Sequence, residues 1–296
     1  MKRIQFIQIA GLIPMISLTL VPGFVNASNE KSSNRSLKAV VMNNLDLTSD
    51  IEFALDKLGG IRQLVKKRSR VVIKPSMAYN QKPGTGFNSD PRLVEHLIRL
   101  CYEAGAREVS VFDHTLDEWT LCYKNSGIER VAKNAEARVL PANEFMYYQP
   151  LPDNSIKSHD PLHIHQAILQ ADIIINVSAS RTNNTSGTGG AIENFTRCFW
   201  ERIIFHTHDN QLSRMLYFRK PTLNITEVWN NTPGYDDIPN FWKRQQLIVS
   251  TDLVVADEVL ASLLKTEYQE VKGLEQAIHL NHEYVQLLPG QVLYID

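Results

Sequence analysis

The sequence predicts an α/β fold: a layered, mostly parallel sheet with helices on both faces and long loops at the carboxyl ends of its strands. Short apolar runs suited to buried strands alternate along the chain with segments whose apolar residues recur at helical spacing. The clearest unit, over residues 70–112, runs strand, long loop, helix and strand, which is the order of a right-handed parallel crossover. The composition, with 43% hydrophobic and 21% charged residues, is that of a globular domain.

In the first half of the chain, strands are predicted at residues 37–42, 70–74 and 108–112. A helix over 48–64 begins at polar cap residues and is interrupted by Gly59-Gly60. Asp90 followed by Pro91 predicts the start of a second helix, because proline is favoured at the first helical position, and Gly105 predicts its end.

In the second half, strands are predicted at residues 138–140, 172–177, 222–228 and 247–250, with an edge strand within 285–295. Helices are predicted at residues 161–170, 191–205 and 253–264.

The N-terminus predicts an export signal over residues 1–27. Lys2 and Arg3 form a positive start, residues 9–24 are apolar, and Ala27 completes a small-residue cleavage site. The apolar run is short and broken by prolines, so no stable membrane span is expected after signal removal. We therefore expect a flexible tether at 28–36, a single α/β domain at 37–296, and a periplasmic or extracellular location; general secretion and a lapsed twin-arginine signal both fit.

Charge and cysteine content argue against two classes of function. With 31 basic and 32 acidic residues, the chain lacks the long-range positive field that favours nucleic acid. Three cysteines without four-thiolate spacing do not provide for an iron–sulfur cluster. Hydrolase and zincin signatures such as Gly-x-Ser-x-Gly and His-Glu-x-x-His are also missing.

Polar side chains follow several predicted strands, at the sheet edge where ligands of such folds bind. In chain order these are Lys74 and Ser76, then Asp113, His114 and Thr115, then the loop 178–190 with Arg181, Gly187, Thr188 and Gly189, and finally Glu227. The glycine-rich loop is either a flexible turn or a substrate or anion loop, because glycine lets the backbone approach a ligand.

These residues allow alternative roles. Lys74 is either a point charge for an anion or a strand-end lysine that reaches water. Asp113 and His114 form an acid/base pair, metal ligands or neither. His163-x-His165 has spacing that suits a metal in a strand, although a surface or capping role is favoured. The cofactor is left unknown, with a divalent metal as the candidate.

A series of motifs in fixed order identifies a family resemblance. The motifs are Val72-Ile73-Lys74-Pro75, Asp90-Pro91-Arg92-Leu93-Val94, Ala104-Gly105-Ala106, Val111-Phe112-Asp113-His114-Thr115, Cys122-Tyr123-Lys124-Asn125-Ser126-Gly127-Ile128, Ala171-Asp172-Ile173-Ile174-Ile175-Asn176-Val177, Trp200-Glu201-Arg202 and Ser250-Thr251-Asp252. The series resembles the bacterial "domain of unknown function 362" proteins over residues 38–265. The resemblance implies the fold and, from relatives with twin-arginine signals, export; it does not imply a settled reaction.

The chain departs from that family at site positions. Relatives carry a Lys-Asn pair where this chain has Glu193-Asn194, and histidines where Asn183 and Asn184 follow Arg181. A lysine-to-glutamate change inverts a charge and is expected to weaken an anion site, and asparagine does not titrate as histidine does. Asn194 keeps the family residue and joins the expected substrate-binding set.

Three functions remain open. The first is an enzyme acting on a small anionic metabolite, with Lys74, Asp113, His114 and Arg181 in one enclosed pocket. The second is a catalytically lapsed binding or accessory protein of the same fold. The third, an electron-transfer partner, follows only from ferredoxin-bearing relatives, and the cysteine content argues against it.

Overall fold

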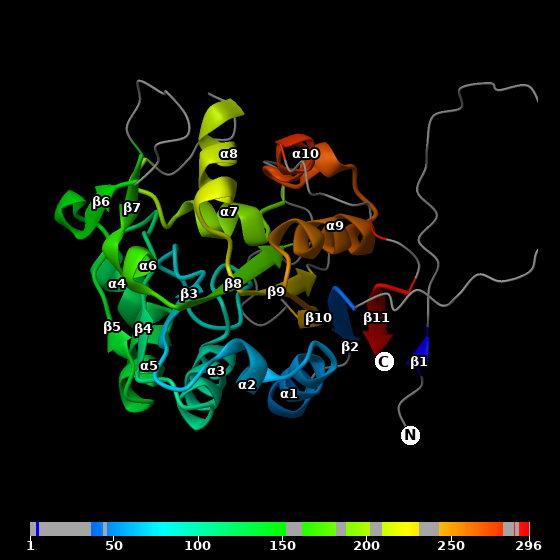
Figure 1. Ribbon diagram of the computed structural model, residues 1–296, viewed down its shortest axis with the longest axis horizontal. Coiled ribbons are helices and arrows are strands. Elements are labelled where there is room, and N and C mark those ends of the chain that lie inside the picture. The colour runs from blue at the N-terminus through cyan, green and yellow to red at the C-terminus, as the bar shows by residue number, and fades with distance from the viewer. Residues whose placement is uncertain are drawn as a thin grey trace, which may run out of the picture.

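The computed structural model describes residues 4–5, 37–43, 46–151, 162–181, 188–201, 209–230, 243–280, 287 and 290–295. Nearly all of the expected signal peptide, the tether, Asn183, Asn184 and Gly187 lie outside these ranges. Within them the chain forms a large mixed sheet with helices on both sides (Figure 1).

The strand order of the large sheet is β1-β11-β2-β10-β9-β8-β3-β4-β5. The strands are β1 (Ile4–Gln5), β2 (Ala39–Asn43), β3 (Arg70–Pro75), β4 (Glu108–Val111), β5 (Arg138–Val139), β8 (Ile173–Arg181), β9 (Leu223–Asn230), β10 (Lys243–Ser250) and β11 (Val292–Ile295). Strands β9, β8, β3, β4 and β5 are parallel neighbours, as are β11 and β2; β10 is antiparallel to both of its neighbours, and β1 to β11. The predicted fold class, a mostly parallel α/β sheet, is confirmed.

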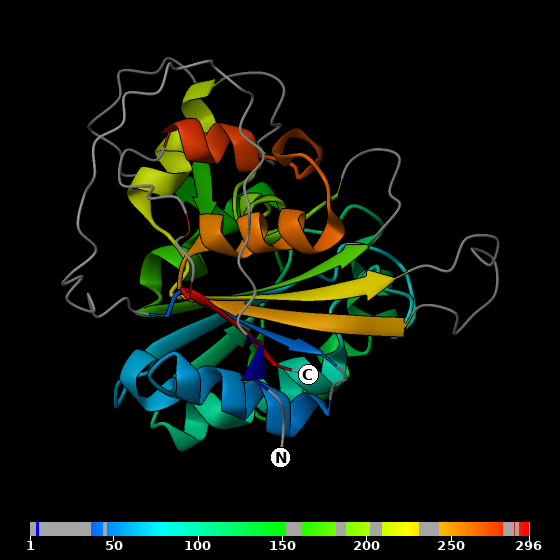
Figure 2. The ribbon, with the colours of Figure 1, turned by 90° about the vertical axis from the view of Figure 1, so that its right-hand side faces the viewer.

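Helices cover both faces of this sheet (Figure 2). One face carries α1 (Leu47–Lys57), α2 (Ile61–Leu64), α3 (Pro91–Glu103), α4 (Trp119–Asn125) and α5 (Ile128–Asn134). The opposite face carries α6 (Gln166–Gln170), α7 (Ala191–Thr196), α8 (Asp209–Phe218), α9 (Leu253–Leu264) and α10 (Leu274–Leu280). Successive strand side chains point to opposite faces, so each face packs its own apolar core against its own helices.

Several predicted elements form where local chemistry indicates them. The Asp90 carboxylate accepts from the Arg92 backbone N–H at 2.8 Å and caps α3, which carries Pro91 at its first position. Asp252 caps α9 in the same way, accepting from Val254 N at 2.8 Å. Within the ranges given above, no helix has the length and apolar character needed to cross a membrane.

Two predicted helices are shorter than expected. Residues His163–His165 form β7, which pairs with β6 (Tyr148–Pro150) instead of starting a helix, and only α6 follows. In α6 the His165 ring caps the helix, with Nδ1 accepting from Ala167 N at 3.2 Å, so the capping role is confirmed. The helix predicted over 191–205 ends at Thr196, because the chain then turns and Trp200 N donates to His163 O at 2.9 Å.

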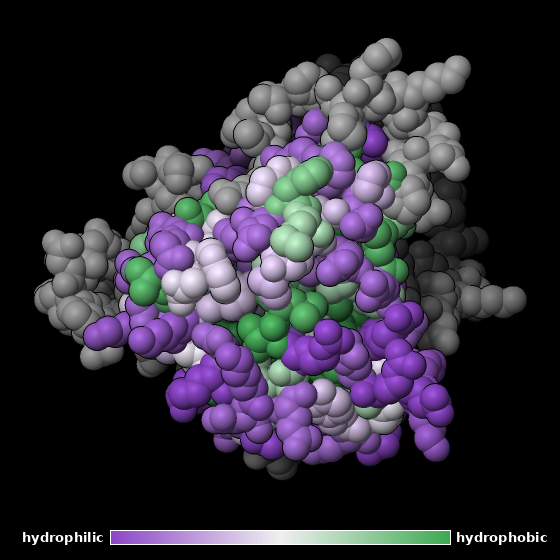
Figure 3. All heavy atoms as spheres, turned by 90° about the vertical axis from the view of Figure 1, so that its left-hand side faces the viewer, coloured by the Kyte–Doolittle hydropathy of each residue, from purple (hydrophilic) through white to green (hydrophobic). Residues whose placement is uncertain are grey.

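The side of the molecule near β6 and α4 is mostly hydrophilic, with small apolar areas (Figure 3). The large apolar side chains exposed in the described residues include Leu116, Leu121, Phe145 and Met146. Phe145 and Met146 belong to a short 3₁₀ turn, η1 (Phe145–Tyr147), and a second such turn, η2 (Tyr268–Glu270), precedes α10.

Candidate functional site

A buried polar band crosses the middle of the sheet on the face covered by α7. Lys74 on β3 is paired in register with Asn176 on β8, and Asn176 with Asn224 on β9. Two residues further along, on the same face, Ser178 pairs with Thr226, and their hydroxyls lie 2.9 Å apart. All five side chains are buried. Buried polar groups need partners, so this band fixes how α7 sits on the sheet.

Asn194 on α7 joins the helix to the band. Its side-chain amide donates to Asn176 Oδ1 at 2.8 Å and to the backbone oxygens of Lys74 and Val177, each at 3.2 Å. Its Oδ1 accepts from Lys74 Nζ at 2.9 Å. The amide thus sits at the junction of β3, β8 and α7, and it is held from both sheet strands.

A charged cluster lies beside this amide at the carboxyl ends of β3 and β4. Lys74 Nζ is 2.6 Å from Asp113 Oδ1, and Arg197 Nε is 3.3 Å from the same oxygen. The other oxygen, Oδ2, accepts from Met77 N at 2.8 Å. Lys74 and Asp113 are fully buried. One carboxylate therefore compensates two buried cations, and the cluster keeps a surplus positive charge when Lys74 is protonated.

Burial lowers the pKa of Lys74 to about 8, although the Asp113 carboxylate acts in the opposite direction. For Arg197, burial also lowers the pKa, but the charges of Asp113 and Glu193 outweigh it, and the pKa lies above its ordinary value. Lys74 therefore titrates close to neutrality, while Arg197 stays charged. Burial raises the pKa of the neighbouring Cys198 thiol to about 12, so that thiol stays protonated.

Above this cluster a small pocket opens, with a cavity volume of about 50 Å³. Its lining comes from the loop after β3, the end of β8, the α7 region and the segment after η2: Ser76, Tyr79, Gly86, Phe87, Ser178, Ala179, Arg181, Gly189, Gly190, Glu193, Asn194, Arg197 and Lys272. A water molecule needs roughly 10–15 Å³ of such space, so this volume suits a ligand of a few non-hydrogen atoms.

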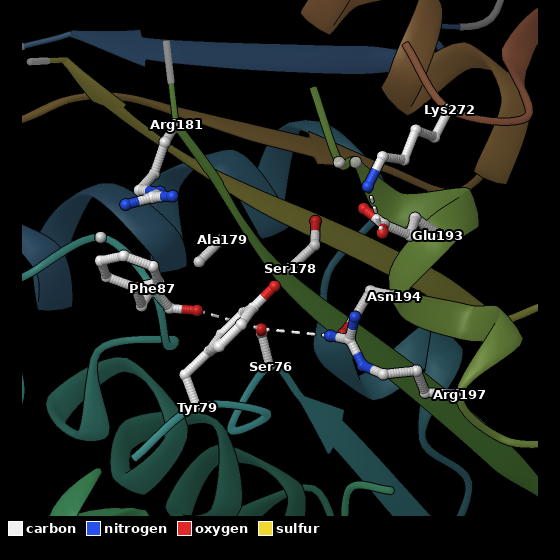
Figure 4. A pocket seen from close by; sticks show the side chains of 13 residues that line it. Ser76, Tyr79, Phe87, Ser178, Ala179, Arg181, Glu193, Asn194, Arg197 and Lys272 are labelled. Atoms are coloured by element: carbon white, nitrogen blue, oxygen red, sulfur yellow. Dashed lines mark hydrogen bonds and ion pairs between the residues drawn. The ribbon is translucent and has the colours of Figure 1, made fainter. Parts of the chain in front are cut away.

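Figure 4 shows hydroxyl groups at the centre of the pocket and charges at its sides. Arg181 lies on one side, stacked over the Phe87 ring with its Cζ 3.5 Å from the ring centroid. Arg197 lies on the other, where one terminal nitrogen, Nη2, donates to Ser76 Oγ at 3.2 Å and to Asn194 Oδ1. Its second terminal nitrogen, Nη1, has no hydrogen-bond partner among the residues that the structure describes. Two unused guanidinium donors therefore line the pocket.

The negative charge of Glu193 is compensated by a residue that lies far from it in the sequence. Glu193 on α7 lines the pocket, and Lys272, which follows η2, places Nζ 2.9 Å from Glu193 Oε1. The carboxylate also packs against Gly189, where an added Cβ would clash with Glu193 Oε2. Among the residues that line the pocket, the side chains of Arg181, Arg197 and Lys272 are basic and that of Glu193 is acidic.

In the described part of the glycine-rich loop and of α7, the first two helix amides are not available to an anion. The first amides of α7 are already bound: Ala191 N donates to Asp257 Oδ1 at 2.6 Å, and Ile192 N to Asp257 Oδ2 at 2.9 Å. Thr188 forms backbone hydrogen bonds with Glu270 and Lys272. At the start of α7, the place expected for a bound anion is therefore taken by the Asp257 carboxylate of α9.

The structure brings Ser76, Arg181, Gly189 and Asn194 into the pocket lining and places Lys74 and Asp113 directly beneath it. It separates the three remaining described candidates that lie near strand ends. His114 stacks on Trp200 with ring centroids 5.3 Å apart, Thr115 donates to Asp117 O at 2.7 Å, and Glu227 accepts from Asp90 N at 2.8 Å. The enclosed pocket expected to unite Lys74, Asp113, His114 and Arg181 does not form from the described residues.

Sequence reasoning missed Arg197, Lys272 and Asp257, which come from three other parts of the chain. It also missed the polar band. A signal for the band was present, because Asn176 and Ser178 alternate with apolar residues in β8 and so mark one polar face of a buried strand. Across the residues that the structure describes, no three His, Cys, Asp or Glu side chains come together as a metal ion would require.

Comparisons with known proteins give a family and a distant structural likeness. The family model described as "Domain of unknown function (DUF362)" matches residues 71–262. The chain is similar to the lactate racemase apoprotein from Thermoanaerobacterium thermosaccharolyticum, with a TM-score of 0.47 and 11% sequence identity. That match covers 79% of this chain and 58% of the racemase, so the chain spans less than two thirds of the racemase's length. No curated protein matches the chain.

Proposed function

Since the chain belongs to the DUF362 family, whose description assigns no function, we propose one from its own pocket: it binds a small anion bearing a carboxylate or phosphate group at Arg181 and Arg197. The observation that carries the proposal is the pair of unused Nη1 donors on a buried, charged guanidinium that faces the pocket. Guanidinium groups match the planar oxygen pairs of such anions and bind them through charge-assisted hydrogen bonds.

The surroundings of Arg197 support a prearranged site. Asp113, Ser76 and Asn194 each bond the guanidinium, so its orientation is set before a ligand arrives. Arg181 is held by its stack on Phe87 at the other side of the pocket. Rigid donors gain affinity because little side-chain freedom is lost on binding.

The direct test is titration calorimetry of the folded chain with sulfate and with acetate. We expect both to bind, and we expect Arg181→Gln to weaken sulfate binding by about tenfold or more, since a hydrogen bond to a charged group contributes about 1.5–3 kcal/mol. Arg99→Gln is the matched control, because Arg99 is an exposed cation on α3 and does not line the pocket. Absence of binding to the wild-type chain, or equal effects of the two variants, would refute the proposal.

A second function, proton-transfer catalysis on the bound anion, is favoured by one observation. Lys74 lies beneath the pocket in contact with Asp113, and burial lowers its pKa to about 8, close to neutrality, where a general acid or base works best. In the present geometry Lys74 Nζ bonds Asp113, Asn194 and Pro75 O, which uses its three protons. A ligand complex with a substrate atom within about 3.2 Å of Lys74 Nζ would support catalysis, and a ligand held only by the arginines would support a binding protein.

We also propose that the chain is exported, on the support of its N-terminal sequence alone. N-terminal sequencing of the protein recovered from the periplasm or medium tests this. A mature start at Ser28 is expected, and recovery of the intact N-terminus in the cytoplasm would contradict it.

A further inference from the structure

A carboxylate outside the pocket holds the helix that supplies the pocket's side chains. Asp257 lies on α9 and is fully buried, and its two oxygens accept from Ala191 N and Ile192 N at 2.6 and 2.9 Å. These amides have no partner within α7, because the first turn of a helix leaves its N–H groups unpaired. The contact is close: a Cβ added to Gly190 would clash with the same carboxylate.

The α7 segment carries much of the pocket's chemistry. Glu193 and Asn194 line the pocket from the helix, and Arg197 lines it from the residue that ends the helix. The helix has only six residues, so a change at its start is not absorbed before it reaches these side chains. Its other fixed point at the start is Asn176, whose Nδ2 donates to Ala191 O at 2.9 Å.

We infer that Asp257 is a positioning residue, which sets the anion affinity of the pocket by fixing the start of α7. It touches no pocket ligand, because it does not line the cavity. The inference rests on the proposed anion-binding function and adds to it the residue that keeps Asn194 and Arg197 in place.

The positioning depends on the charge of Asp257. An ionised carboxylate accepts through both oxygens, whereas a protonated one has a hydroxyl in place of one acceptor and loses one of the two amide bonds. Burial raises the pKa of Asp257 to about 7, against the effect of the Ile192 and Ala191 amides, and the charge of Glu193 raises it further. Glu193 is the one charged group that shifts this pKa among the described residues packed on α9, and Lys272 faces Glu193 in turn.

The test compares Asp257→Asn with Asp252→Asn in the full-length mature chain. Asp252 is a matched control, because it also accepts two backbone N–H groups, those of Val254 and Val255, but these belong to its own helix α9 and not to α7. Sulfate is the probe, since its charge does not change between about pH 5 and about pH 9. Calorimetric affinity is measured across that range, and hydrogen exchange of α7 is measured alongside.

For the wild type we expect sulfate affinity to fall below about pH 7, where Asp257 takes up a proton, and above about pH 8, where Lys74 loses its charge. In Asp257→Asn we expect affinity about tenfold lower at pH 8, no fall on the acid side, an unchanged fall on the alkaline side, and faster exchange of the α7 amides. Asp252→Asn keeps the wild-type affinity and pH profile, even where its unfolding temperature is lower.

The outcomes separate the two proposals. Two results would overturn the positioning role but leave the anion pocket standing. One is a sulfate affinity that is equal in the wild type and in Asp257→Asn; the other is a fall in affinity below about pH 7 that persists in that variant. A wild-type chain that binds neither sulfate nor acetate would overturn the anion pocket and the positioning role with it.

Discussion

The buried cluster beneath the pocket leads to a quantitative prediction for Asp113→Asn. The substitution keeps the shape of the side chain but removes the one carboxylate that compensates Lys74 at 2.6 Å and Arg197 at 3.3 Å. Removing one partner of a buried ion pair costs about 3–5 kcal/mol, because the remaining charge is left unsolvated and unpaired. For a chain of this size that corresponds to a fall in Tm on the order of 10 °C.

The loss should depend on pH in a defined direction. Without Asp113, burial and Arg197 both lower the pKa of Lys74, which then falls below its present value of about 8. The variant thus loses the Lys74 proton at a lower pH than the wild type, so its deficit in the free energy of unfolding should shrink as the pH rises towards about 8 and stay constant above it, where both folded chains have lost this proton. Combining Lys74→Met with Asp113→Asn removes the buried Lys74 charge at every pH. This double variant should therefore be more stable than Asp113→Asn alone.

Denaturant unfolding followed by circular dichroism measures these differences for the wild type, Asp113→Asn, Lys74→Met and the double variant. A loss under about 1 kcal/mol in Asp113→Asn, or a double variant less stable than Asp113→Asn, would refute the account of a single carboxylate holding two buried cations.

Three further predictions use the same unfolding and binding assays. Gly190→Ala should lower the free energy of unfolding by about 1–3 kcal/mol, because the new Cβ meets the buried Asp257 carboxylate; an unchanged value would contradict that close contact. His114→Ala should lower stability by about 1 kcal/mol through loss of the stack on Trp200, yet leave sulfate affinity unchanged; a change in affinity would bring His114 back into the site. The difference in the free energy of unfolding between the wild type and Lys74→Met should rise in favour of the wild type between about pH 8 and about pH 10.5, because the unfolded wild-type chain still binds the Lys74 proton that its folded state has lost; a constant difference would contradict the lowered pKa of Lys74.

Much of the fold could be predicted because its signals are local. The caps at Asp90 and Asp252 accept from amides two or three residues away, and Pro91 favours the helical conformation at its own position. The parallel strands follow from apolar runs and crossover order, which are also properties of neighbouring residues. The predicted lengths of two helices were wrong because non-local contacts decide them. His163–His165 and the turn after Thr196 pair with each other, and His163–His165 also pairs with β6.

In the candidate site, too, some residues could be predicted from local patterns and others could not. Local patterns predicted that Lys74, Ser76, Asp113 and Arg181 lie at strand ends, and therefore at one edge of the sheet, because the carboxyl ends of parallel strands share that edge. Which of these residues meet depends on contacts between distant parts of the chain. The register between β3, β8 and β9 forms the polar band, and α7, α9 and the segment after η2 bring Arg197, Asp257 and Lys272 to it. Those contacts join residues up to 121 positions apart, as between Arg197 and Ser76, and depend on strand order and helix packing, which no local pattern encodes.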